Sequence, residues 1–139
     1  MRPRDGSVRY GGCPVRATSA VMAGKWKVEI VWYLAFGTKR FAELRALLPG
    51  VSEKMLAAQL KSLIRDGIVS RIETDRKPPR VDYSLTAAGN ELVYLMNDLC
   101  AWGVRHLGVP PTMAGMPPML KAHLEGGKVR PQRAGRTKK

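Results

Sequence analysis

The segment PGVSEKMLAAQLKSLIRDGIV, residues 49–69, contains a helix start, a helical apolar stripe and a helix stop in that order. Ser52 suits the N-cap position because its hydroxyl can accept a hydrogen bond from a free backbone N–H of the first turn. Gly67 suits the position after the last turn, which favours a left-handed backbone. The segment therefore predicts an amphipathic helix that packs on a core by one face. The residues of that face are Leu56, Leu60, Leu63 and Ile64.

Three shorter helices are predicted before this segment, from apolar residues at helical spacing with a proline or glycine at their ends. Their expected ranges are 15–23, 25–36 and 41–48. The short link 49–51 separates the last of them from the helix after Ser52, so the two form a candidate helix-turn-helix. This feature alone is weak evidence, because any helical domain contains such pairs.

Downstream, the apolar pattern changes from helical spacing to alternation. The segments Val69–Thr74 and Arg80–Leu85 are short and largely alternating, which is typical of half-buried strands. The tip between them, 75–79, is basic and contains two prolines, which cannot donate to a strand ladder. The order of elements along the chain is four helices, a β-hairpin and a last helix. This order is much more specific evidence for a fold than a helix pair. They predict a mainly α domain with a small β-hairpin wing (α+β), namely a winged helix-turn-helix with a three-helix core.

A terminal helix is predicted from a cap at Thr86 to about His106. Its apolar stripe is longer than one small domain can easily cover, and a second copy of the chain would cover it. We therefore expect a homodimer; the alternative is that this helix packs back on its own domain. The interface candidates on it are Leu92, Leu95, Met96, Leu99 and Trp102.

The 139 residues fit one domain, and their net charge of +13 favours contact with nucleic acid or an anionic membrane surface. The charge is uneven. Residues 109–139 carry seven basic and one acidic residue, net +6, whereas 13–108 carry net +5 and 1–12 net +2. We expect a flexible arm over 1–12, a DNA-binding and dimerisation domain over 13–108, and a disordered Pro/Gly-rich basic tail over 109–139.

Several classes of protein are disfavoured. No apolar run approaches the roughly 20 residues that a membrane span needs, and the N-terminus has no apolar signal-peptide core, which predicts a cytoplasmic protein without a membrane partner. The two cysteines form no CxxC pair, so no metal is expected. No phosphate-binding loop, dinucleotide motif or partnered nucleophile occurs, so neither a cofactor nor an enzyme is expected.

The side of the central helix opposite its apolar stripe is the candidate DNA-reading face. Recognition helices read base edges with their N-terminal residues. Exposed alanines allow close approach and can contact a thymine methyl group, although alanine is also simply a good helix former. The base-edge candidates are Ser52, Lys54, Ala58 and Gln59. The backbone or minor-groove candidates are Lys39, Arg40, Lys61, Arg65, Arg76, Lys77 and Arg80, each of which taken alone is more often a solvated surface charge.

The two cysteines have different expected surroundings. Cys13 falls at the start of the first predicted helix, with Arg16 one turn away. The helix dipole and the nearby cation both favour a thiolate, so Cys13 is a candidate redox or electrophile sensor. A buried, inert cysteine is the alternative. Cys100 lies on the apolar side of the terminal helix and is expected in the core.

Seven short runs between residues 13 and 107 follow one another in a recognisable order. They are Cys13-Pro14-Val15, Gly24-Lys25-Trp26-Lys27, Arg40-Phe41-x-Glu43-Leu44, Pro49-Gly50-Val51-Ser52-x-Lys54-Met55-Leu56, Leu60-x-x-Leu63-x-x-Asp66-Gly67, Pro79-Arg80-Val81-x-Tyr83-Ser84-Leu85-Thr86-x-x-Gly89 and Trp102. Together they closely resemble the HxlR-type helix-turn-helix family, relatives of the MarR-type regulators. Both ends of the chain lie outside the resemblance.

The resemblance implies a bacterial transcriptional regulator, a repressor or dual regulator, that binds operator duplex DNA as a homodimer. The recognition helix would enter the major groove, and the wing would meet the adjacent backbone or minor groove. The N- and C-terminal helices would be the dimerisation helices, which adds Val15 to the interface candidates. Some family members sense oxidants or electrophiles through a cysteine matching Cys13, so an oxidant or small-molecule effector is a candidate.

The alternative to a DNA-binding regulator is a basic RNA- or ribosome-associated protein. Readers of single-stranded RNA stack bases on exposed aromatic side chains. The aromatic residues here fall at core-like spacings, which counts against this alternative. They are Trp26, Trp32, Tyr33 and Phe41.

Overall fold

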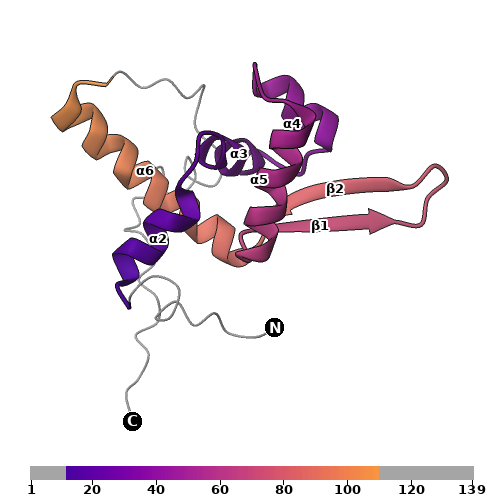
Figure 1. Cartoon of the computed structure of the whole chain (residues 1–139), viewed down its shortest axis with the longest axis horizontal. Helices are drawn as coiled ribbons and strands as arrows, with labels where there is room; N and C mark the ends of the chain where they lie inside the picture. Colours follow the sequence, from indigo (N-terminus) through magenta and orange to yellow (C-terminus); the bar gives the residue numbers. More distant parts are fainter. Residues whose placement is uncertain (1–11, 110–139) are drawn as a thin grey trace, which may run out of the picture.

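The computed structural model describes residues 12–109, so the expected arm over 1–12 and tail over 109–139 lie almost entirely outside the described residues. Five helices and a two-stranded hairpin form the described part (Figure 1). In chain order they are α2 (Pro14–Met22), α3 (Lys27–Leu34), α4 (Phe41–Leu47), α5 (Glu53–Arg65), β1 (Val69–Thr74), β2 (Arg80–Leu85) and α6 (Ala87–Leu107). The prediction of a mainly α winged helix-turn-helix is confirmed.

The helix boundaries follow local backbone chemistry. Pro14 occupies the first turn of α2, and the hydroxyl of Ser52 accepts a hydrogen bond from the backbone N–H of Met55 (3.0 Å) at the start of α5. Gly67, after the end of α5, has a φ of 74° and adopts the left-handed conformation expected of it. The helix predicted over 25–36 is shorter, because residues after Leu34 make tighter hydrogen bonds to carbonyls three positions back.

The hairpin is antiparallel, with Val69 opposite Leu85 at its base and Thr74 opposite Arg80 near its tip. Both strand ranges agree with the sequence prediction. The structure adds a backbone pairing that the sequence did not indicate: Lys39 N–H donates to Tyr83 O (3.0 Å) and Tyr83 N–H donates to Lys39 O (2.8 Å). This pairing fixes the base of the wing to the link between α3 and α4.

The core lies around α3, which contacts α4, α5, β2 and α6. Ile30 of α3, Leu44 of α4 and Leu56 of α5 are fully buried, and Val93 of α6 joins them from the other side. In contrast, α2 buries no residue completely and lies beside α6 at one end of the molecule, while the hairpin projects from the opposite end (Figure 1). The molecule therefore has a wing end and an α2–α6 end.

The first turns of α6 are joined closely to the segment between α5 and β1. The Thr86 hydroxyl accepts a hydrogen bond from Gly89 N–H (3.1 Å) and donates to Gly67 O (2.6 Å), while Thr86 N–H donates to Ile68 O (3.0 Å). Gly89 is buried and packs directly on Ile68. The start of α6 is thereby anchored at the point where the central helix passes into the wing.

Two expectations for α6 are wrong. Leu92 and Met96 are buried in the chain's own core, so they are not available to a second copy. Cys100 is exposed rather than in the core. Cys100 follows Met96 by one turn, but Met96 is the last residue of α6 that is buried, and the residues after it are half-buried or exposed.

Candidate nucleic-acid interface

The exposed side of α5 brings together most of the predicted DNA-reading residues. The core-facing side is occupied by Leu56, Leu60 and Leu63, all buried. Because an α-helix repeats every 3.6 residues, positions three or four apart share a side. The exposed side therefore forms a stripe of cations around two small side chains. Its members are Lys54, Ala57, Ala58, Lys61 and Arg65, all exposed, with exposed Ser52 at the helix N-terminus.

An ion pair joins α4 to the first turn of α5. Arg45 Nη1 lies 2.7 Å from Glu53 Oε1, and both side chains are largely exposed. An unpaired carboxylate here would repel a phosphate backbone. Arg45 partly offsets that charge and connects the two helices of the helix-turn-helix.

Gln59 differs from the other base-edge candidates because its side chain turns inward. Its Oε1 is buried without a hydrogen-bond partner among residues 12–109, and a Cβ added to Gly24 would lie 3.5 Å from it. The amide nitrogen instead donates to the sulfur of Met55 (Nε2–Sδ 3.5 Å). In this conformation Gln59 contacts the turn between α2 and α3 rather than the open side of α5.

The wing carries both signs of charge. Arg76 and Lys77 are exposed at its tip. Arg80 is half-buried, and its Nε lies 2.9 Å from Asp82 Oδ1 on the same side of β2. Arg80 is thus already paired with a carboxylate, which makes it a less available cation than the two at the tip.

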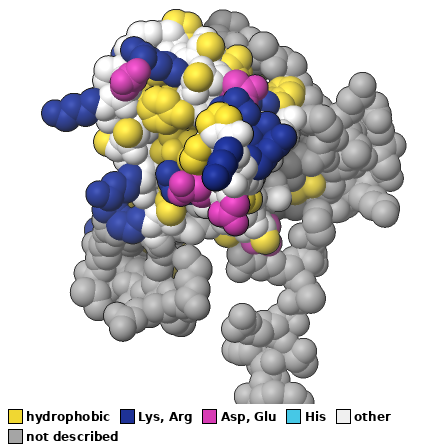
Figure 2. Space-filling model, turned by 90° about the vertical axis from the view of Figure 1, so that its right-hand side faces the viewer, with side chains coloured by type: hydrophobic (Ala, Val, Ile, Leu, Met, Phe, Trp, Pro, Cys, Tyr) yellow, Lys and Arg dark blue, Asp and Glu magenta, His cyan; other side chains and the backbone are white. Residues whose placement is uncertain are grey.

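Two further cations lie near the start of α4. Lys39 is half-buried in the pairing with Tyr83, whereas Arg40 is exposed and its backbone N–H donates to Glu43 Oε1 (2.8 Å). Seen from the wing end, basic side chains surround this face of the molecule, with acidic and apolar side chains between them (Figure 2). This face carries charges of both signs. The positions of its unpaired cations therefore matter more for contact with a phosphate backbone than the net charge of the chain.

Three residues of this face were not predicted from the sequence: Arg45, Met55 and Arg71. Arg71 of β1 is exposed and lies 3.3 Å from Glu73. Hydrogen bonding with the Tyr83 side chain and then with Glu73 raises the pKa of Arg71 above its ordinary value, so it remains a cation. Arg71 lies two residues after buried Val69 on the same side of β1, so alternation alone does not mark it as an exposed cation. Met55 is 43% exposed, and its position beside the apolar stripe suggested no role.

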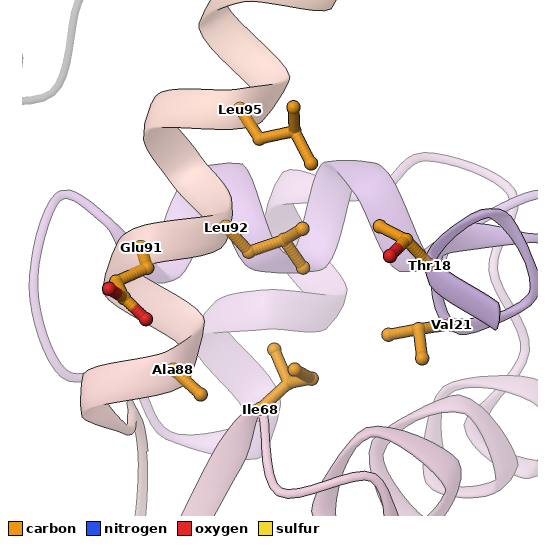
Figure 3. A pocket seen from close by; sticks show the side chains of 7 residues that line it. All are labelled: Thr18, Val21, Ile68, Ala88, Glu91, Leu92 and Leu95. Atoms are coloured by element: carbon orange, nitrogen blue, oxygen red, sulfur yellow. The ribbon is translucent and has the colours of Figure 1, made fainter. Parts of the chain in front are cut away.

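The α2–α6 end has a different character. Val15, Leu99, Trp102 and Leu107 are all exposed apolar side chains there. Two hollows of about 250 and 280 Å³ lie between α2 and α6, with Thr18 and Leu95 lining both. In the first, the side chains of Val21, Ile68 and Leu92 point toward one another (Figure 3). This end is mostly apolar, whereas the wing end is charged.

No helix within 12–109 is long and apolar enough to cross a membrane. No group of three His, Cys, Asp or Glu side chains within the same range is arranged to hold a metal ion. The aromatic residues considered for RNA stacking belong to the core or pack against it: Trp32 is buried, and Trp26, Tyr33 and Phe41 lie against the buried cluster.

Comparison with known proteins agrees with this geometry. A family model described as HxlR-like helix-turn-helix matches residues 21–110. The chain belongs to the HxlR-like helix-turn-helix family. The match includes both helices of the helix-turn-helix, the wing and α6, so the predicted HxlR-type resemblance is confirmed.

Similar proteins are found both by sequence and by structure. The uncharacterized HTH-type transcriptional regulator YtcD of Bacillus subtilis (strain 168) is 43% identical over 93 residues, which are 67% of this chain and 74% of YtcD. A crystal structure of ytcD is similar with a TM-score of 0.65 at 40% identity, covering 70% of this chain and 99% of that chain. The redox regulator HypR in its reduced form has a TM-score of 0.64 at 38% identity, covering 68% and 96% respectively. This HxlR-like chain is therefore an HTH-type transcriptional regulator and DNA-binding protein rather than an enzyme.

Proposed function

We propose that this regulator binds operator duplex DNA as a homodimer, with α5 in the major groove and the wing on the adjacent backbone or minor groove. The observation that carries the proposal is the exposed stripe of α5, where Lys54 and Lys61 lie one turn to either side of Ala57 and Ala58. A helix with small side chains at its centre can approach base edges closely, which would bring Lys54 to a base edge and Lys61 to a phosphate. The tip cations Arg76 and Lys77 would extend contact beyond the groove that α5 enters.

The homodimer is supported by the α2–α6 end. Leu99 and Trp102 are about half exposed and Leu107 is 65% exposed on α6, and exposed apolar side chains that gather at one end of a molecule mark an interaction surface. A second copy, related by a two-fold axis, would cover them with the same surface. The two recognition helices would then face two half-sites of a palindromic operator.

The test begins with the full chain and random-sequence duplex DNA, from which bound sequences are selected and the tightest is used as operator. Replacing Lys54 with Ala should weaken operator binding by about 1–3 kcal/mol if Lys54 contacts a base edge. Replacing Arg80 with Ala should weaken it less, because Arg80 is already paired with Asp82. If either residue contacts a phosphate, its removal should lower the slope of log K against log salt by about one unit.

The matched control is Arg105→Ala, which removes the same charge near the last turn of α6, at the end opposite the wing (Figure 1). Its operator affinity should stay close to that of the unchanged chain. Unchanged affinity for both Lys54→Ala and Arg80→Ala would refute the assignment of the DNA-reading face. Failure to select any sequence would refute operator binding itself.

We also propose a redox response through Cys13. The supporting observations are that Cys13 is exposed at the N-cap of α2, next to the proposed dimer surface, and that the similar protein HypR is a redox regulator. Oxidation there would alter α2 and hence the pairing of two copies. A Cys13→Ser variant should lose any effect of diamide or hydrogen peroxide on operator binding, whereas Cys100→Ser should retain it. An unchanged oxidant response in Cys13→Ser would exclude this cysteine as the switch.

A further inference from the structure

Met55 is an exposed apolar side chain in the part of α5 that would enter the DNA first. It occupies the first turn of the helix, and its backbone N–H is held by the Ser52 hydroxyl at 3.0 Å. Its side chain is 43% exposed, whereas the next residue, Leu56, is fully buried. The fold of the single chain leaves the thioether side chain of Met55 partly in contact with water. Packing in the core therefore does not explain why a methionine occupies this position.

Gln59 holds the end of this side chain. Its amide Nε2 donates to Met55 Sδ at 3.5 Å, one helical turn away. The other end of the amide, Oε1, is buried beside the turn at Gly24 and has no hydrogen-bond partner among residues 12–109. Methionine has three rotatable bonds and is normally adaptable. Here a half-buried neighbour restricts it to one region of the helix surface.

We propose that Met55 determines operator specificity by packing against thymine methyl groups in the major groove, and that Gln59 is a positioning residue for it. This inference rests on the proposed operator binding. An uncharged thioether gains little beside a phosphate. On the base edges of the major groove, the apolar group is the C5 methyl of thymine. Gln59, predicted from the sequence to read bases itself, would instead act through Met55.

The test compares thymine with deoxyuridine, which differs only by this methyl group. The full chain is titrated by fluorescence anisotropy with its selected operator and with duplexes in which each thymine in turn is replaced by deoxyuridine. Burying one methyl group contributes about fourfold in affinity. The unchanged chain should therefore lose about fourfold at one or more thymines in each half-site, and little at flanking thymines.

Three variants then test whether Met55 and Gln59 cause the preference for thymine. Met55→Leu should keep the preference for thymine, because it remains apolar. Met55→Gln, of similar length but polar, should bind the thymine and deoxyuridine duplexes equally. Gln59→Ala should lower the preference without changing the salt slope, since no charge is removed. The control Lys54→Ala should weaken binding to both duplexes by the same factor and leave their ratio unchanged.

The results separate this inference from the function on which it rests. Specific binding with equal affinity for thymine and deoxyuridine operators overturns the role of Met55 and leaves operator binding intact. A full thymine preference in Met55→Gln also overturns it. If no operator can be selected at all, both proposals fail together. Since Met55 lies outside the buried core and is 43% exposed, circular dichroism should show Met55→Leu and Met55→Gln folded like the unchanged chain.

Discussion

Replacing Gly89 with Ala should destabilise the protein, although alanine is the better helix former. Gly89 lies in the first turn of α6, and an added Cβ would come within 2.3 Å of the backbone oxygen of Ile68. Real Cβ contacts essentially never fall under 3.0 Å, so the two backbones must separate by at least about 0.7 Å. The Ile68 oxygen is a backbone atom and cannot move aside as the end of a flexible side chain could. The added Cβ would also lie 3.1 Å from Leu85 Cδ2.

The size of the change in unfolding free energy follows from two destabilising contributions and one stabilising contribution. Overpacking against a rigid neighbour costs about 1–3 kcal/mol. The same displacement strains the Thr86 N–H bond to Ile68 O (3.0 Å), and a hydrogen bond contributes about 0.5–1.5 kcal/mol. Alanine in place of glycine inside a helix returns up to about 1 kcal/mol. The free energy of unfolding should therefore fall by about 1–3 kcal/mol, and Tm by about 4–8 °C for each kcal/mol in a domain of this size.

Gly103 provides the matched control in the same helix. No atom of the described part of the chain lies within 4 Å of a Cβ added there, so Gly103→Ala should gain helix propensity and stabilise α6 by up to about 1 kcal/mol. Urea unfolding of both variants is followed by circular dichroism. It is measured at two protein concentrations, because Gly103 lies near the proposed dimer surface. If the Gly89→Ala variant is as stable as the unchanged chain, the close contact between α6 and Ile68 is refuted.

Three other changes have definite expected outcomes. Ser52→Ala removes the N-cap bond to Met55 and should lower the free energy of unfolding by about 0.5–2 kcal/mol in thermal denaturation, while Ser62→Ala, whose hydroxyl only accepts from the exposed Arg65 (3.3 Å), should change it little. Leu99→Asp places a charge on the proposed dimer surface and should give a folded monomer in sedimentation velocity; a persisting dimer would place the interface elsewhere. Asp82→Asn releases Arg80 from its 2.9 Å pair and should raise operator affinity up to about fivefold at low salt, whereas weaker binding would show that the pair holds the wing in place.

The fold could be predicted largely because the helix signals of this sequence are local. Ser52, Gly67 and Thr86 each act within one turn of the chain, and their roles as caps are confirmed. The two strand ranges follow from alternation over six residues each and agree with the structure. The boundaries that differed, as at the end of α3, depend on whether the last turn is α-helical or tighter, which side-chain periodicity does not determine.

The parts that could not be predicted depend on contacts between distant elements. The ion pair of Arg45 with Glu53 crosses the turn between two helices, and the pairing of Lys39 with Tyr83 joins a loop to a strand far along the chain. The inward turn of Gln59 depends on Gly24, which belongs to a different helix connection. Periodicity gave the correct apolar side of α6, but not the point at which the body of the domain ends. Leu92 and Met96 were therefore assigned to a partner, and Cys100 to the core.

The junction at Gly89 also bears on how two copies would read DNA. The same helix, α6, carries the exposed side chains of the proposed dimer surface and packs without any intervening side chain on Ile68, between α5 and β1. In a homodimer formed through α6, the separation of the two recognition helices would then be set by a backbone contact rather than by a flexible linker. Half-sites in such a complex are spaced by one helical turn of DNA or a multiple of it. We therefore expect Gly89→Ala to weaken binding to the selected operator and to reduce the preference for the half-site spacing of that operator, because a displaced α6 misplaces both recognition helices at once.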